Sequence, residues 1–179
     1  GIKIKLKNEI CEIDGNGLNG YNYKKNLVLN AGNSGTLGRL ILGLLINSPK
    51  KIKLIGDKSL SKRDFSRVIN PLKEFGANFY PKDKSTLPLY IKGTDFVRPI
   101  KYFEKKGSAQ IKSCIMLASL NAPGTTKIHA KKSRNHTEIL YKFLKLPISI
   151  TNKGELDLIK ISGEKKINPF NYNIPSDIS

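Results

Sequence analysis

Two short polar loops stand directly before long apolar runs, and their residue types suit anion binding. The residues concerned are Asn33, Gly35 and Thr36 in one loop and Ser108, Ala109 and Gln110 in the other. The apolar runs at 40–46 and 115–120 predict buried helices, whose starts offer free N–H groups and a favourable dipole to an anion. Gly35 also lacks a Cβ, so backbone and ligand can approach closely. Helix capping alone would also explain Ser34 and Gly35.

Two arginines lie in polar loops that precede amphipathic segments. Arg63 ends the first of these loops, and Arg134 follows Ser133 in the second. A guanidinium group binds a carboxylate or phosphate through two parallel hydrogen bonds, which a lysine cannot reproduce. Each charge-assisted bond is worth roughly 1.5–3 kcal/mol. We expect Arg63 to clamp an anion, against the simpler interpretation of a solvated arginine before a helix. Arg39 could equally be a structural partner inside the domain.

The composition favours a globular protein that attracts anions. The chain has 179 residues, 39% of them hydrophobic, and a net charge of +18 from 32 Lys and Arg against 14 Asp and Glu. A charge of this size attracts anionic partners over long range, although lysine-rich solvated faces would give the same count. No zinc pattern, RNP-like motif or Arg-rich run indicates nucleic acid, and we expect none as a partner.

Metal-dependent, secreted and membrane-spanning classes find no support in the sequence. Cys11 and Cys114 share no metal-like spacing with each other or with His129 and His136. The longest apolar stretch is far shorter than the roughly 20 residues of a membrane span. The first residues alternate instead of forming a signal-peptide core. We therefore expect no metal and no membrane association, and a reducing, cytoplasmic setting.

An internal repeat organises the two loops. In each copy a buried helix leads to a short strand, a polar loop and a second helix with a one-sided apolar stripe. A β-hairpin closes each unit, pairing 77–80 with 88–92 and 148–151 with 156–161, with a turn at 152–154 in the latter. We name residues 27–93 and 100–163, approximately, the second and the third unit.

The N-terminal segment repeats the closing hairpin of these units once more. Residues 1–17 alternate, turn near Asn8 and reach Gly17, with no polar loop or helix before them. We therefore expect 1–17 to be the closing hairpin of an incomplete first unit.

Together these motifs resemble those of the EPSP synthase family of enolpyruvyl transferases. The matching stretches are 30–36 with Arg39, 56–63 with 67–72, 108–113, and 133–138, in this order. The resemblance implies an α/β (α+β) fold in which repeated βαβαββ units surround buried helices, the inside-out α/β barrel domain of this family. It also implies that 174–179 begin the crossover to a second domain outside this sequence.

The resemblance further implies an activity and its ligands. The family transfers an enolpyruvyl group from phosphoenolpyruvate to the 5-hydroxyl of shikimate 3-phosphate, in chorismate and aromatic amino-acid biosynthesis. The implied phosphoenolpyruvate ligands are Asn33, Gly35, Thr36, Arg63 and Gln110, and those for shikimate 3-phosphate are Ser108, Ala109, Gln110, Ser133 and Arg134. No metal or cofactor is implied, and the acidic and basic catalytic groups belong to the second domain. We therefore expect no catalytic residue here, and a monomer that alone binds substrate weakly and is inactive.

Two other interpretations stay open. A UDP-N-acetylglucosamine enolpyruvyl transferase performs the same chemistry on another alcohol, typically with a reactive cysteine on a mobile loop. Cys11 and Cys114 fall instead in a predicted strand and a predicted helix. A non-catalytic basic module on the same fold would bind nucleic acid and lose affinity steeply with salt. The uncharged residues Asn33, Ser108 and Gln110 speak against that module, because generic anion binding needs only Lys and Arg.

Overall fold

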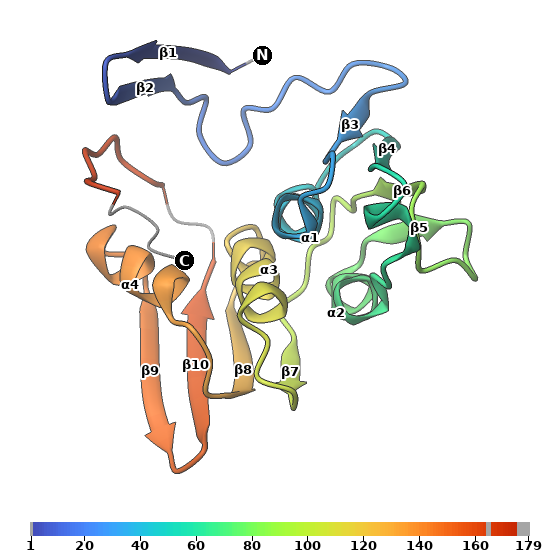
Figure 1. Ribbon diagram of the computed structural model, residues 1–179. Coiled ribbons are helices and arrows are strands. Elements are labelled where there is room, and N and C mark those ends of the chain that lie inside the picture. Colours follow the sequence, from blue (N-terminus) through green and yellow to red (C-terminus); the bar gives the residue numbers. More distant parts are fainter. Residues whose placement is uncertain (1, 164–165, 175–179) are drawn as a thin grey trace.

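The computed structural model describes residues 2–163 and 166–174 (Figure 1). In chain order, the elements are β1 (Lys3–Lys7), β2 (Ile10–Asp14), β3 (Val28–Asn30), α1 (Gly35–Leu44), β4 (Ile52–Ile55), the 3-10 helix η1 (Leu60–Lys62), α2 (Ser66–Phe75), β5 (Asn78–Tyr80), β6 (Leu89–Lys92), β7 (Lys101–Glu104), α3 (Ala109–Ser119), β8 (Thr125–Lys131), α4 (His136–Phe143), β9 (Ile148–Lys153) and β10 (Leu156–Ser162).

Each of the two units builds one four-stranded sheet with the same topology. The strand order is β3-β4-β6-β5 in the second unit and β7-β8-β10-β9 in the third. The first two strands of each sheet run parallel, and the other neighbouring pairs run antiparallel. A helix connects the parallel strands of each sheet, as such a crossover requires. The repeated βαβαββ arrangement expected from the sequence is confirmed.

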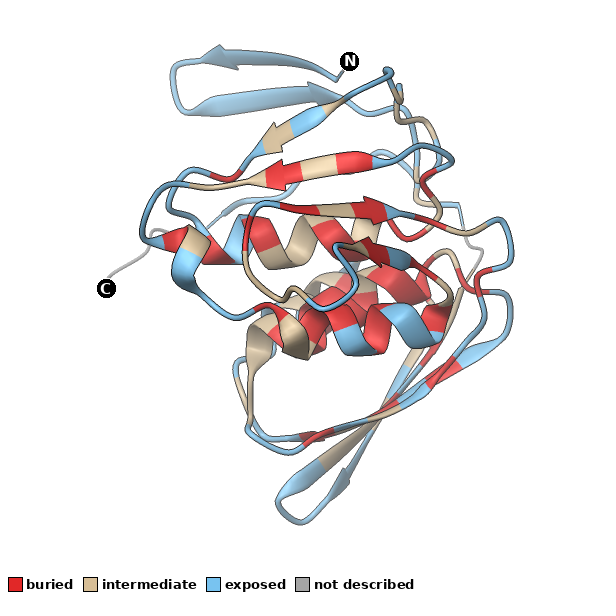
Figure 2. Ribbon diagram, turned by 90° about the vertical axis from the view of Figure 1, so that its right-hand side faces the viewer, coloured by how far each residue is buried: buried red, intermediate tan, exposed pale blue. Residues whose placement is uncertain are grey.

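Helices α1 and α3 pack against each other between the two sheets (Figure 2). Most of α3 is buried, whereas α1 buries Gly35, Gly38, Leu42 and Gly43 and leaves Leu37 49% exposed. The two helices run parallel and in register. Gln110 at the start of α3 contacts Thr36 at the start of α1, and Asn47 meets Asn121 beyond the two C-terminal ends. Gly43 permits this close approach, because a Cβ there would lie 2.3 Å from a backbone carbonyl oxygen of α3. Both helix starts therefore lie at one end of the molecule.

Serine side chains cap both buried helices, as the sequence predicts. Ser34 Oγ accepts a hydrogen bond from the Leu37 N–H at 3.1 Å, and Ser108 Oγ accepts one from the Ile111 N–H at 3.4 Å. These bonds satisfy helix-start donors that would otherwise lack a partner. The outer helix α2 ends at Gly76, which adopts the left-handed conformation typical of glycine.

The closing hairpin of the third unit differs from the prediction in its turn. The predicted turn at 152–154 is wrong, because β9 continues through Lys153 and the turn consists of Gly154 and Glu155. Gly154 has a φ of 65°, which a residue without a Cβ adopts at little cost. Asn152 remains in the strand, where its Nδ2 donates to Asp157 Oδ1 at 3.3 Å.

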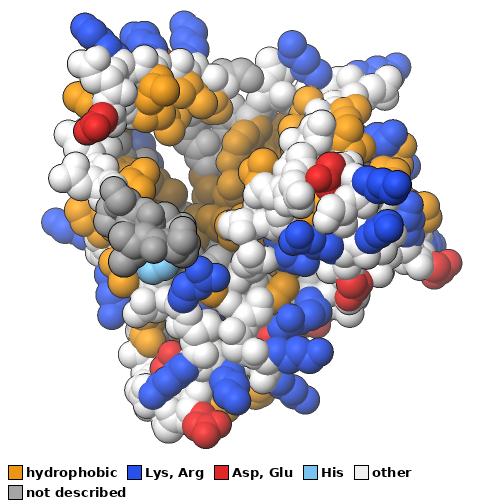
Figure 3. Space-filling view, viewed as in Figure 1, with side chains coloured by type: hydrophobic (Ala, Val, Ile, Leu, Met, Phe, Trp, Pro, Cys, Tyr) orange, Lys and Arg blue, Asp and Glu red, His pale blue; other side chains and the backbone are white. Residues whose placement is uncertain are grey.

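The β1–β2 hairpin stands apart from both units (Figures 1 and 3). The two strands pair with each other, and every residue in them is exposed, including Ile4, Leu6, Ile10 and Ile13. Figure 3 shows a hollow between the hairpin and the helices, with hydrophobic side chains on its walls. The assignment of 1–17 to an incomplete first unit stays a prediction. Most of the expected crossover at 174–179 lies outside the described residues, as does residue 1.

Candidate anion-binding site

Two arginine side chains converge on the first residue of α1. The point that a Cβ of Gly35 would occupy lies 2.9 Å from Nη1 of Arg39 and 3.0 Å from Nη1 of Arg63. Because Gly35 has no side chain, both guanidinium groups fit beside the start of the helix, where the N–H groups of the first turn lack intrahelical acceptors. Positive side chains and a helix N-terminus thus meet at one point, which favours an anion.

The electrostatics of this point also favour an anion. Desolvation lowers the pKa of Arg39, and the neighbouring charges of Arg63 and Arg67 lower it further, while Asp64 opposes the shift. Arg67 is already paired with Glu104, at 2.5 Å between Nη2 and Oε1. A ligand carboxylate or phosphate between Arg39 and Arg63 would relieve their mutual repulsion.

Gln110 joins the start of α3 to the same site. Its Nε2 donates to Thr36 Oγ1 at 2.8 Å, and its Oε1 accepts from Arg39 Nη1 at 2.9 Å. The side chain therefore bridges the second and third units at the end where both buried helices begin. Of the residues expected to bind phosphoenolpyruvate, the structure brings Gly35, Thr36, Arg63 and Gln110 together. Asn33 lies exposed just before the cap of α1.

The loop before α3 is held by a carboxylate that the sequence reasoning missed. Glu104, at the end of β7, is only 3% exposed. Its Oε2 accepts the Ser108 N–H at 2.8 Å, and its Oε1 accepts the Lys106 N–H at 3.3 Å as well as the Arg67 guanidinium. Glu104 thereby fixes the backbone leading to Ser108 and Ala109. A single acidic residue at a strand end gives no sequence signal of this role.

The loop before α4 is held by a buried ion pair, also missed. Lys112 lies within α3, and its Nζ contacts Glu138 Oε1 at 2.5 Å and donates to the Arg134 carbonyl oxygen at 3.0 Å. The Arg134 side chain is exposed. The Ser133 Oγ is buried and makes no hydrogen bond within the described part of the chain. The sequence does contain a signal for this pair. Lys112 lies inside a largely apolar helix, and a lysine is rarely buried unless it is paired.

The two cysteines lack the setting of a reactive loop thiol. Cys114 is fully buried in α3, and burial raises the pKa of its thiol to about 12. Cys11 is exposed, but it lies on strand β2. The expected positions of both cysteines are confirmed. The interpretation that needs a loop cysteine gains no support.

Part of the positive charge lies on the outer sheet faces. Lys51 Nζ stands 4.5 Å from the ring centroid of Tyr80, and Lys101 Nζ stands 5.2 Å from that of Phe103. Phe103 stacks on His129 with 4.5 Å between centroids. Such lysines lie along apolar or aromatic surface with their charge in water. Figure 3 likewise shows Lys and Arg side chains spread around the edge of the molecule.

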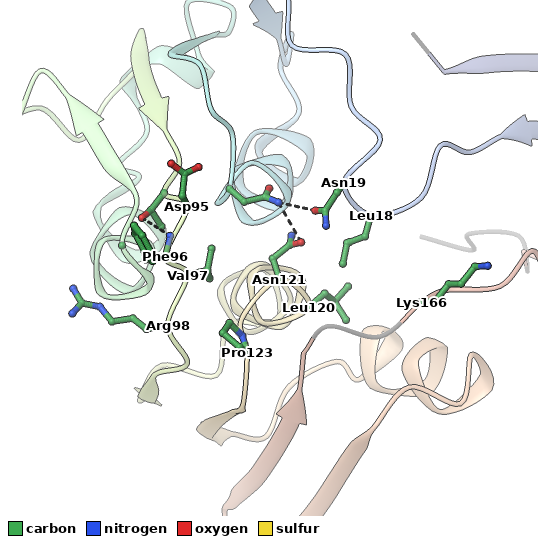
Figure 4. Close-up of a pocket in the computed structure, with 13 residues that line it drawn as sticks. Leu18, Asn19, Asp95, Phe96, Val97, Arg98, Leu120, Asn121, Pro123 and Lys166 are labelled. Carbon is green, nitrogen blue, oxygen red and sulfur yellow. Dashed lines mark hydrogen bonds between the residues drawn. The ribbon is translucent and has the colours of Figure 1, made fainter.

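A cavity of the structure lies away from the candidate site (Figure 4). It measures about 1140 Å³ and lies beyond the C-terminal ends of α1 and α3, where Asn47 donates to both Asn19 and Asn121. None of the predicted ligand residues lines it. Helix C-terminal ends carry partial negative charge, which disfavours anions. Anion binding is therefore favoured at the helix starts. A smaller hollow of about 640 Å³ lies beside Arg63 and is lined by residues of the loop 57–63.

The described residues contain no group of three or more His, Cys, Asp or Glu side chains arranged to hold a metal ion. No helix among them is both long and apolar enough to cross a membrane.

Comparison with known proteins shows the family of this chain. The family model described as EPSP synthase (3-phosphoshikimate 1-carboxyvinyltransferase) matches residues 1–179. The 3-phosphoshikimate 1-carboxyvinyltransferase of Vesicomyosocius okutanii is 45% identical over 181 residues, covering 100% of this chain and 40% of the relative. That of Streptococcus pyogenes serotype M1 is 38% identical, covering 100% and 41%.

A solved structure shows the same likeness. EPSP synthase from Acinetobacter baumannii superposes with a TM-score of 0.82 at 34% identity, covering 93% of this chain and 37% of that one. The present chain thus spans about two fifths of the length of the curated relatives it matches. A family match over all 179 residues, on a fold of repeated βαβαββ units, shows that this chain belongs to the EPSP synthase family.

Proposed function

We propose that this chain is the part of a 3-phosphoshikimate 1-carboxyvinyltransferase that binds phosphoenolpyruvate and shikimate 3-phosphate in one of its domains. The observation that carries the proposal is the convergence of Arg39 and Arg63 on Gly35, joined to α3 by Gln110. Both substrates are polyanions, so positioning and charge neutralisation make up much of the task of the site.

The two ligands would occupy neighbouring places at this end of the molecule. Phosphoenolpyruvate would lie between Arg39, Arg63 and the start of α1, where the forked guanidinium groups suit its carboxylate or phosphate. Shikimate 3-phosphate would lie nearer α3 and α4, with its phosphate at Ser133 and Arg134. Gln110 stands between the two places and suits a contact with both ligands.

The reaction itself would need groups from elsewhere in the enzyme. Attack of the 5-hydroxyl on the enol carbon requires a proton donor for the methylene group and a base for the hydroxyl. We assign neither step to a residue of the candidate site. The Cys114 thiol is fully buried, and its raised pKa makes it too weakly acidic to take part. We propose that a second domain supplies these groups. The chain alone would bind substrate weakly and without turnover, as a cytoplasmic monomer.

The test is an NMR titration of the ¹⁵N-labelled chain with shikimate 3-phosphate, repeated with Arg134→Ala and at raised salt. The expected result is saturable shifts at Ser108, Gln110 and Ser133 that Arg134→Ala abolishes. Diffuse shifts that disappear with salt and persist in the variant would instead favour a generic basic surface. An absence of shifts in the parent would contradict a preformed half-site in this chain.

A further inference from the structure

The proposed function assigns no role to the buried ion pair of Lys112 and Glu138. We propose that Lys112 and Glu138 are positioning residues, which hold the loop 133–135 in the shape that receives the phosphate of shikimate 3-phosphate. This inference rests on the proposed function for the identity of the ligand. The holding of the loop is measurable without any ligand.

Burial and contacts show that this pair lies in the interior. Lys112 is 1% exposed and Glu138 is 4% exposed, with 2.5 Å between Nζ and Oε1. Removing two charges from water costs several kcal/mol per ion, which a pair alone seldom recovers. Lys112 Nζ also donates a hydrogen bond to the Arg134 carbonyl oxygen, at 3.0 Å. The hydroxyl groups of Ser113 and Thr137, at 2.7 Å, join the same two helices at neighbouring positions.

The second unit shows that the fold does not require an ion pair here. Counted from the N-cap residues of the four helices, Lys112 corresponds to Gly38 and Glu138 corresponds to Val68. In the second unit this place is filled by apolar contact. Val68 is fully buried, and a Cβ on Gly38 would lie 3.4 Å from the ring of Phe65. The charged pair is therefore specific to the third unit.

The two units nevertheless share one contact. Asp64 and Arg134 each stand directly before the N-cap of the second helix of their unit. Arg39 Nη2 donates to the Asp64 carbonyl oxygen at 3.5 Å, and Lys112 Nζ donates to the Arg134 carbonyl oxygen. In both units a cation from the buried helix thus holds the carbonyl beside a predicted anion ligand. We infer that both units hold this loop in place by the same kind of contact, which is made by different residues in each unit.

The charge of the pair also points to positioning and away from direct ligation. Glu138 neutralises Lys112, and Lys112 already contacts both Glu138 and the loop carbonyl. A phosphate would then be held by the exposed Arg134 side chain and by the Ser133 Oγ, which is buried without a partner in the described chain. Fixing the carbonyl of Arg134 restricts the backbone from which both of these groups project.

The test uses the double variant Lys112→Met/Glu138→Leu, which preserves the net charge of the chain. Replacing a buried ion pair by apolar residues of similar size is often neutral or stabilising, so we expect a melting temperature within a few degrees of the parent. The backbone ¹⁵N order parameters at 134–136, measured by NMR relaxation, are expected to fall from about 0.85, typical of a rigid backbone, to below about 0.6. The affinity for shikimate 3-phosphate is expected to fall about tenfold, whereas the order parameters of β10 stay as in the parent.

The matched control is Lys127→Met/Glu155→Leu, which removes one exposed charge of each sign from the same unit. This variant is expected to keep the parental order parameters at 134–136 and the parental affinity. If the Lys112/Glu138 double variant folds but keeps the parental order parameters at 134–136, the proposal is wrong, whether or not the ligand binds. If the parent fails to bind shikimate 3-phosphate, the proposed function fails for this chain, and the comparison of order parameters still decides the positioning role.

A second variant covers the case in which the apolar pair does not fold. The double variant Lys112→Gln/Glu138→Gln keeps hydrogen-bonding groups in the buried space. Its shorter side chain at position 112 does not reach the Arg134 carbonyl. Lowered order parameters at 134–136 in a folded chain would support the positioning role. Failure of both double variants to fold would overturn it, because the pair would then be a requirement of the fold.

Discussion

Replacing Gly35 by alanine would set a methyl group against both arginines of the candidate site. The new Cβ would lie 2.9 Å from Arg39 Nη1 and 3.0 Å from Arg63 Nη1. Non-bonded atoms pack at roughly 3.5 Å, so each guanidinium group would have to withdraw by about 0.5 Å. Both contacts involve the far ends of flexible side chains, and this displacement should therefore cost the fold little.

The stability of the fold should consequently change little or improve. Gly35 is the first residue of α1 and its φ lies outside the left-handed region, so alanine meets no backbone strain. Alanine is favoured over glycine within a helix by up to about 1 kcal/mol, with a smaller gain expected at the first position. We expect the free energy of unfolding of Gly35→Ala to lie within about 1 kcal/mol of the parent value.

Anion binding should weaken clearly in the same variant. A charge-assisted hydrogen bond contributes roughly 1.5–3 kcal/mol and declines as donor and acceptor separate. Losing part of two such bonds would cost about 1–2 kcal/mol, which is roughly a 5- to 30-fold loss of affinity for phosphoenolpyruvate. The assay is an NMR titration that follows the side-chain Nε–H resonances of Arg39 and Arg63, with thermal unfolding measured in parallel.

Gly38→Ala provides the matched control, one helical turn away. A Cβ there would meet the Phe65 ring at 3.4 Å and the Ala31 Cβ at 3.6 Å, which are close to ordinary contacts, and it would meet no guanidinium group. This variant should keep both arginine resonances and the parental affinity. The reasoning is refuted if Gly35→Ala binds phosphoenolpyruvate as the parent does with unmoved arginine resonances. Destabilisation by more than about 2 kcal/mol would likewise refute the claim of cheap displacement.

Three further predictions test separate features of the chain. Arg63→Lys should bind phosphoenolpyruvate about tenfold more weakly with unchanged melting, because lysine keeps the charge of this exposed side chain but lacks the fork; the same titration measures it. A thiol reagent at pH 8 should label Cys11 in the folded chain and reach Cys114 only in urea, since burial raises the pKa of Cys114 to about 12. The pKa of His129, measured by NMR, should lie below 6.5 because of desolvation and neighbouring lysines, and added salt should raise it. Because the folded chain then binds this proton less tightly than the unfolded chain, the contribution of His129 to stability should fall as the pH drops through and below about 6.5.

The repeated architecture could be predicted from the sequence because it follows from local patterns. Apolar runs without a polar side predict buried helices, and a serine before each run predicts its cap; Ser34 and Ser108 confirm this. The predicted turn at 152–154 was wrong because a strand end depends on cross-strand bonds as much as on turn-forming residues. Asn152 is held in β9 by its register with β10.

The supporting charges of the site could not be predicted, because their partners are distant in the sequence. Glu104 acts on Arg67, 37 positions away, and Lys112 acts on the Arg134 carbonyl, 22 positions away. Neither separation follows from helical or strand periodicity. Whether such a charge is paired depends on how the units pack, which is a property of the fold and of no single segment.

Cavity volume and the electrostatics of the two central helices point to opposite ends of the molecule. The two helices run parallel, so their dipoles add and give the two ends of the pair opposite character. The cavity of about 1140 Å³ lies at the end with helix carbonyls, where the neighbouring asparagines already hydrogen-bond one another. The other end gathers N–H groups together with Arg39 and Arg63 around a glycine. If an anionic substrate binds at the helix starts, as proposed, a site search by volume alone would select the other end of the molecule.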